Sequence, residues 1–399
     1  MDAKLMAPGA GGACADSVCA EGGTEMDFYE EVGIAPYINA HDTYTVYGGS
    51  RMAPQTLEAM AQAARHFVDM EELQRTLGQR IAQMTHNEAA FLCNGASAGM
   101  LTAAAVCMAR GSMWRFSRLP EIVRGTAGEI VTLHCQHNAY DKAIAASGAR
   151  VVEVGDTDET PVYELEGALN ENTAAVFYFA SALYARASLP LEEVIRIAHG
   201  RGVPVVVDAA AQLPPVDNLW RFTQMGADLV IFSGGKTLCG PQDSGLILGR
   251  ADLIEDCIRF GAPAHGVCRS GKISREAMAG LYTAIKLYLQ TDQTAHTAQL
   301  RQMNETIARA LEPLDAVART EIVPFGPVGQ TYPRLFAYLK QGIDAKAVRD
   351  AMRKAHIYIG IEPEKNAIYI SPLNLSAEEA VQVEHCLVSV LTAGPETRP

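Results

Sequence analysis

The stretch LVIFSGGKTLCGPQDSGLILG, residues 229–249, places Lys236 in a glycine-rich turn between two apolar runs. The triplet that ends at Thr237 reads G-K-T, as in a nucleotide-binding P-loop. That motif also requires a glycine five positions before Gly235. Val230 stands there. The P-loop interpretation is therefore excluded, and Lys236 needs another chemical role.

Other residues that could do chemistry also follow apolar runs. The run VTLHCQ leads to His137, and VPVVV leads to Asp208. The run FLC leads to a turn of small residues that opens an alanine-rich helix, namely Asn94, Gly95, Ala96 and Ser97. Backbone N–H groups at such a helix start form an anion site suited to a phosphate.

A phosphate site, a flat ring, a carboxylate and a lysine are together what pyridoxal 5'-phosphate (PLP) requires. Lys236 would form the Schiff base with the cofactor's aldehyde. Asp208 would keep the pyridine nitrogen protonated, so that the ring can act as an electron sink. His137 would stack on that ring, and Ser233 would add a hydrogen bond to the phosphate. Each residue alone has a commoner structural role, so the prediction rests on the ordered set.

A metal site is the alternative for His137, because His134 and Cys135 are close to it in the sequence. Side chains alternate between the two faces of an extended strand. These three would then not converge, and a structural histidine is the simpler interpretation. We therefore expect no metal site.

The order of elements predicts an α/β fold. From about residue 88 to 249, buried β-branched strands alternate with helices, which indicates a mostly parallel sheet covered on both faces. Ligands of such sheets lie at the carboxyl ends of the strands. One long helical stretch is expected from Ile273 to about Leu311, followed by a small α+β region. We expect a flexible tail at 1–26, an N-terminal segment plus a large PLP-binding domain at 27–290, and a small C-terminal domain at 291–399.

Composition excludes several classes of protein. The net charge is −13, from 33 basic and 46 acidic residues, whereas nucleic-acid binders normally carry a basic footprint. The nine cysteines include no C-x-x-C pair, so a disulfide framework or zinc ribbon is not indicated and a reducing cytoplasm is expected. No apolar stretch of 18 residues occurs, so no membrane span is expected.

Six segments carry a resemblance to a known family: INAHDTYTVYGGSRM, FVDMEELQRTLGQRIAQM, NGASAG, QHNAYDKAI, VVVDAAAQLPP and FSGGKTLCGPQDSGLILGR. They resemble the selenocysteine-synthase-like branch of fold-type-I PLP enzymes, which have the aspartate aminotransferase-like fold. The branch includes seryl-tRNA(Sec) selenium transferase and D-glucosaminate-6-phosphate ammonia-lyase. The resemblance covers about residues 27–390.

The resemblance implies further roles. Ala210 and Gln212 would line the cofactor ring, and a homodimer or larger even assembly is expected. The segment HGVCRSGKIS resembles a loop that reaches a neighbouring subunit's site, where Arg269 and Lys272 would bind phosphate or an anionic substrate. Selenium transferases that hold tRNA carry an additional N-terminal domain. Here only about 25 residues precede the resemblance and the charge is acidic, so we expect no tRNA substrate.

The reaction is the least determined point. The resemblance favours α,β-elimination from a small or sugar-derived amino acid, with release of ammonia and a keto acid. Arg51 and Arg334 are candidates to bind the substrate carboxylate. An aminotransferase, a C–S lyase and an O₂-dependent oxidative decarboxylase are alternatives. A non-catalytic PLP-fold binding module has no need of both Lys236 and Asp208. A dinucleotide-binding protein is disfavoured because no G-x-G-x-x-G follows the first strand.

Overall fold

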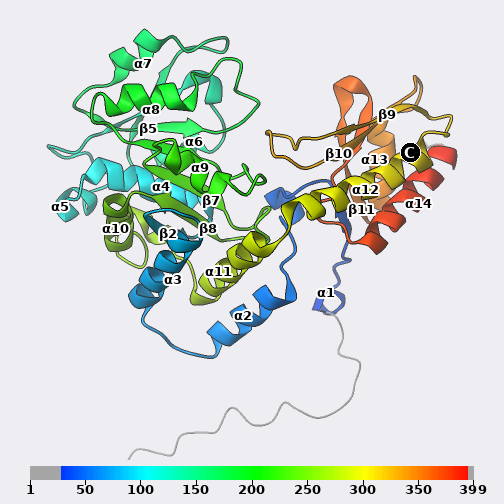
Figure 1. The fold of residues 1–399 in the computed structure, drawn as a ribbon, viewed down its shortest axis with the longest axis horizontal. Coiled ribbons are helices and arrows are strands. Elements are labelled where there is room, and N and C mark those ends of the chain that lie inside the picture. Colours follow the sequence, from blue (N-terminus) through cyan, green and yellow to red (C-terminus); the bar gives the residue numbers. More distant parts are fainter. Residues whose placement is uncertain (1–27, 394–399) are drawn as a thin grey trace, which may run out of the picture. The chain divides into compact units, whose positions relative to one another are not determined.

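The computed structural model describes residues 28–393 (Figure 1). The described residues fall into two units, 28–37 and 38–393. In the first unit the described part contains the short helix α1 (Phe28–Glu31). The predicted tail at 1–26 lies outside the described residues.

A seven-stranded sheet with the order β2-β8-β7-β6-β5-β3-β4 is the centre of the larger part of the second unit. Only β8 runs opposite to the other strands, since it pairs antiparallel with both β2 and β7. The predicted mostly parallel sheet is therefore confirmed. The strands are β2 (Ala89–Cys93), β3 (Glu129–Leu133), β4 (Arg150–Val154), β5 (Thr173–Phe179), β6 (Val205–Asp208), β7 (Leu229–Ser233) and β8 (Gly245–Gly249).

Helices cover both faces of this sheet, which explains why its strands are apolar on both sides. One face packs against α3 (Met70–Met84), α8 (Leu191–His199), α9 (Asn218–Gln224) and α11 (Arg275–Gln290). The other packs against α4 (Gly95–Ala109), α5 (Met113–Phe116), α6 (Asp141–Ala145) and α10 (Ala251–Phe260). In helix α4, 10 of the 15 residues are buried, and most of these have small side chains. Helices α2 (Pro54–Ala64) and α7 (Val162–Ala168) complete this part.

A second sheet has the order β1-β11-β12-β10-β9. Strand β1 (Ile38–Ala40) pairs parallel with β11, so a strand from the beginning of the chain belongs to the sheet of the C-terminal strands. The other strands are β9 (Val317–Val323), β10 (Arg334–Leu339), β11 (Ile357–Glu362) and β12 (Ala367–Ile370), and the sheet shares an apolar core with α12 (Gln293–Leu311), α13 (Ala345–Lys354) and α14 (Ala377–Ala393).

The long helical stretch expected from Ile273 is two helices, α11 and α12, with a break at Thr291 and Asp292. The side chain of Asp292 accepts a hydrogen bond from the backbone N–H of Ala295 at 2.9 Å and so caps a new helix. The domain boundary predicted at 290/291 falls at this break; the division into domains stays a prediction. Within residues 28–393 no helix combines the length and apolar character needed to cross a membrane.

Candidate active site

A cavity of about 290 Å³ lies where β6 and β7 end and α4 begins. Most of the residues predicted to bind the cofactor line it: Gly95, Ala96, Ser97, Asp208, Ala210, Gln212, Ser233 and Lys236. The structure thus brings together residues that are up to 141 positions apart, from Gly95 to Lys236. This agrees with the rule that ligands lie at the carboxyl ends of parallel strands.

The start of α4 forms one wall of the cavity. Its N-cap residue Asn94 makes no side-chain capping hydrogen bond, so the N–H groups of the first turn have no partner from that side chain. Gly95 has φ 79°, in the left-handed region where a side chain is strained, and an added Cβ there would meet nothing within 4 Å. An open space in front of a 15-residue helix's N-terminus fits a phosphate group.

Asp208 ends β6 and Lys236 lies in the turn after the neighbouring strand β7, and both line the same cavity. Asp208 Oδ1 accepts a hydrogen bond from the Ala210 N–H at 2.9 Å. Burial raises the pKa of the Asp208 carboxyl, and the Lys236 charge acts in the opposite direction. Burial likewise lowers the pKa of the Lys236 amine, against the pull of the Asp208 and Asp42 carboxylates. A buried carboxyl of this kind needs a cationic partner to stay ionised, which the ring N–H of PLP would supply.

The loop that carries Lys236 is held by contacts from distant segments. Ser50 Oγ donates a hydrogen bond to the backbone oxygen of Lys236 at 2.7 Å. On the other side, a Cβ added to Gly235 would lie 2.5 Å from Cα of Gln242. Only glycine fits so close to another backbone, which explains the glycine before the lysine.

Asp42 is a buried carboxylate near Lys236 that sequence reasoning missed. It accepts hydrogen bonds from the Thr43 N–H at 2.6 Å and from the Tyr332 hydroxyl at 2.9 Å. Burial raises its pKa. Several lining residues were missed as well: Thr45, Met100, Asn138, Tyr140, Phe179, Ser181, Tyr184, Gln242 and Val328. Asn138 and Tyr140 could have been predicted to line the site, since they lie in QHNAYDKAI, one of the segments that carry the family resemblance.

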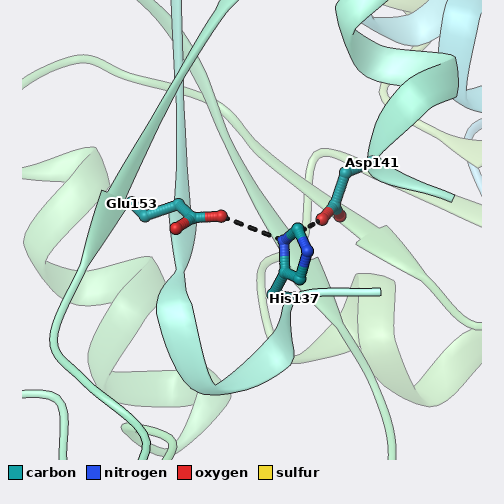
Figure 2. A group of neighbouring side chains, drawn as sticks. All are labelled: His137, Asp141 and Glu153. Carbon is teal, nitrogen blue, oxygen red and sulfur yellow. Dashed lines mark hydrogen bonds and ion pairs between the residues drawn. The ribbon is translucent and has the colours of Figure 1, made fainter. Parts of the chain in front are cut away.

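His137 does not line the cavity. Its Nδ1 lies 2.7 Å from Asp141 Oδ2 and 3.0 Å from Glu153 Oε1, and its side chain is 59% exposed (Figure 2). The predicted stacking on the cofactor ring stays a prediction, and it would need the imidazole to turn away from these carboxylates. Within the described residues the cavity wall offers other rings, those of Tyr140, Phe179 and Tyr184.

His134 and His137 converge on one residue, contrary to the argument from an extended chain. His134 Nδ1 lies 2.8 Å from Glu153 Oε2. After β3 the chain forms the 3₁₀ helix η2 (His134–Gln136), in which residues three apart lie on the same side. The alternation rule for strands was therefore the wrong rule for this segment.

The predicted substrate-binding cations also lie outside the cavity lining. Arg51 pairs with Glu379 and donates to the Asn374 carbonyl. Arg334 Nε donates to the Phe325 carbonyl at 3.0 Å. Arg269 belongs to the 3₁₀ helix η3 (Val267–Gly271), and Lys272 follows it. This loop packs on the first turns of α4, since a Cβ on Gly271 would lie 2.9 Å from Cβ of Ala98.

His41 lies among tyrosine rings beside Asp42, with ring centroids 4.3 Å from Tyr47 and 5.3 Å from Tyr369. Burial, followed by the nearby Arg353 and Arg334 charges, lowers its pKa to about 4. The folded protein therefore binds fewer protons at this site than the unfolded chain between pH 6.5 and about 4, and stability falls as the pH drops through this window.

Substitution His41→Gln tests this contribution. Between pH 7 and pH 5, we expect the unfolding free energy of the wild type to fall by about 1 kcal/mol more than that of the variant. This difference is smaller than the full pKa shift would give, because the ring is partly exposed and solvent screens its charge. Urea denaturation at both pH values measures the difference. Equal losses in the two proteins would show that His41 titrates normally in the folded state.

Comparison with known proteins identifies the family of this chain. Residues 43–318 match the family model described as SelA, L-seryl-tRNA selenium transferase. The chain belongs to this family. The D-glucosaminate-6-phosphate ammonia lyase of Salmonella typhimurium is 33% identical over 287 residues, 71% of this chain and 75% of that protein. The 5'-C-glycyluridine monooxygenase-decarboxylase of a Streptomyces species is 37% identical over 290 residues, 70% of each chain.

The solved structure of D-glucosaminate-6-phosphate ammonia-lyase superposes with a TM-score of 0.81 and 28% identity, covering 93% of this chain and all of that one. The predicted family resemblance and the fold-type-I architecture are therefore confirmed. The protein is an enzyme of this family, and its cofactor is PLP.

Proposed function

We propose that this enzyme catalyses α,β-elimination from a small or sugar-derived amino acid, releasing ammonia and a keto acid. The observation that carries the proposal is the meeting of Lys236 and Asp208 in one cavity with the start of α4. The structure of D-glucosaminate-6-phosphate ammonia-lyase, which superposes on 93% of this chain, supports the reaction class.

The residues of the cavity would hold PLP in a defined orientation. The first turn of α4 and Ser233 would bind its phosphate, Asp208 would pair with its ring nitrogen, and Lys236 would bind its aldehyde. When bound, PLP supplies an electron sink for the charge that develops at the substrate α-carbon. Lys236 is the only amine in the described cavity lining, so its Nζ would move the proton at that carbon. Because burial lowers the pKa of this amine, it can act as a base nearer to neutral pH.

The substrate carboxylate needs a cationic partner. No arginine is among the described residues that line the cavity. We propose that Arg269 and Lys272 reach the site of a neighbouring subunit in an even homo-oligomer, and that Arg334 or Arg51 contributes from the same chain. We further propose a cytoplasmic location, in keeping with the unpaired cysteines found among the described residues.

An O₂-dependent oxidative decarboxylation is the second candidate, because the Streptomyces monooxygenase-decarboxylase is 37% identical to this chain. It would use the same cofactor site and differ in how the substrate is oriented. No observation on the described residues favours an aminotransferase, a C–S lyase or a non-catalytic module.

One assay distinguishes these reactions. The full chain, loaded with PLP, is incubated with a panel of amino acids that includes D-glucosaminate 6-phosphate, and ammonia, CO₂ and O₂ are followed together. Elimination predicts ammonia and a keto acid in equal amounts without O₂ consumption. Release of CO₂ coupled to O₂ consumption would instead show that the enzyme catalyses the oxidative decarboxylation.

Substitution Ser233→Ala tests the phosphate site. Loss of one hydrogen bond to a charged group is expected to weaken PLP binding by about tenfold, or about 1.4 kcal/mol. Fluorescence titration of the apoenzyme measures the dissociation constant. The exposed Ser117, whose hydroxyl donates to the Trp114 carbonyl, gives the control Ser117→Ala. Equal PLP affinity of the Ser233 variant and the wild type would remove Ser233 from the site.

A further inference from the structure

His137, Asp141 and Glu153 form a cluster outside the active-site cavity (Figure 2). They come from three places in the chain: the residue after η2, the first residue of α6 and the fourth of the five residues of β4. The imidazole lies between the two carboxylates, and one potential ligand atom from each residue lies within 4.8 Å of the others.

The hydrogen bonding of this cluster is incomplete. One imidazole nitrogen, Nδ1 of His137, faces two carboxylate oxygens at 2.7 and 3.0 Å, although it can carry only one hydrogen atom. Asp141 is only 7% exposed. Its Oδ2, which faces His137, also accepts a hydrogen bond from the Asn138 N–H at 3.1 Å, whereas its Oδ1 is buried without a hydrogen-bond partner. A buried carboxylate oxygen without a partner is costly unless a cation lies beside it.

We propose that His137, Asp141 and Glu153 bind a divalent transition-metal ion. At metal–ligand distances of about 2.1 Å, neighbouring ligands of an octahedral ion lie about 3 Å apart, close to the two separations from Nδ1. One imidazole nitrogen with two carboxylates suits ions such as Mn²⁺, Fe²⁺ or Zn²⁺ better than Ca²⁺ or Mg²⁺, which prefer oxygen ligands alone. The ion would balance both carboxylate charges without a proton on the imidazole.

His134 is a positioning residue for this site. Its Nδ1 lies 2.8 Å from Glu153 Oε2, which leaves Oε1 directed to His137. Hydrogen bonds of this kind commonly orient metal-ligating carboxylates.

The ion would fix a loop that belongs to the wall of the active-site cavity. Asn138 and Tyr140, which line the cavity, lie in the chain between the ligands His137 and Asp141. Metal binding itself does not depend on the proposed function, but an effect on substrate binding rests on it. We expect removal of the ion to raise KM more than it lowers kcat, because the ion contacts no reacting atom.

The test is calorimetric titration of Mn²⁺ into the full-length, PLP-loaded protein after treatment with a chelator. Mn²⁺ is the probe because the nine cysteines of the chain would attract Zn²⁺. We expect one Mn²⁺ per chain, and an affinity at least tenfold lower in Glu153→Gln. Glu255→Gln is the matched control, since Glu255 is a half-exposed glutamate paired with Arg75 and should leave the affinity unchanged. No binding by the wild type, or wild-type affinity in Glu153→Gln, would overturn the proposal.

The variant His137→Asn separates this role from stacking on the cofactor. If His137 is a metal ligand, the variant should bind Mn²⁺ at least tenfold more weakly than the wild type, and the absorbance maximum of its bound PLP should be unchanged. A shifted maximum with wild-type Mn²⁺ affinity would overturn the metal site and support stacking. The heat of titration measures Mn²⁺ binding, and the absorbance spectrum measures the state of bound PLP. Failure of the metal site and failure of the proposed function therefore give different results.

Discussion

Lys236→Ala is expected to lower kcat by at least about 10³-fold. The substitution removes the only amine from the described cavity lining, and with it both the attachment point of PLP and the group that moves the proton at the substrate α-carbon. Steady-state kinetics at saturating PLP, with the substrate found in the amino-acid panel, measures the effect.

The control for this variant is Lys365→Ala. Lys365 is an exposed lysine that pairs with Glu362 at 2.6 Å, and its loss should leave kcat unchanged. If Lys236→Ala kept kcat within tenfold of the wild type, another residue would have to carry both roles.

Asp208→Asn is expected to lower kcat by about 10²-fold or more, because a charged partner of the cofactor ring becomes neutral while the shape of the side chain is kept. The Asp208 carboxylate also raises the pKa of the Lys236 amine. Its loss should therefore lower that pKa further and move the acidic limb of the rate profile to lower pH. A pH series of kcat for the wild type and the variant measures both effects, because the Lys236 amine is released from the cofactor only while substrate is bound.

Asp252→Asn provides the matched control, since Asp252 is an exposed carboxylate paired with Arg250. Wild-type kcat and an unmoved acidic limb in Asp208→Asn would show that this carboxylate does not partner the cofactor.

The residues at strand ends could be predicted because their positions follow from the sheet itself. Apolar runs identify parallel strands, and parallel strands bring their carboxyl ends to one edge, so Asp208, Ser233 and Lys236 had to meet near the start of α4. These positions depend on the backbone and only weakly on side-chain conformations.

Positions outside the strands were harder to predict. The 3₁₀ turn η2 brings His134 and His137 together on Glu153, although no local signal distinguishes it from an extended chain. Asp42 becomes a buried neighbour of Lys236 through the tertiary hydrogen bond from Tyr332, 290 residues away. The long cationic side chain of Arg51 pairs with Glu379, an acidic partner that the sequence motif around Arg51 does not indicate.

The most direct test of the central claim is the absorbance spectrum of the purified full chain after loading with PLP, beside that of Lys236→Ala. PLP bound covalently to Lys236 predicts a band near ~420 nm in the wild type, a property of the cofactor joined to a lysine, and its absence in the variant. The same band in both proteins would show that another residue holds the cofactor. No band in either would contradict the assignment of this cavity to PLP.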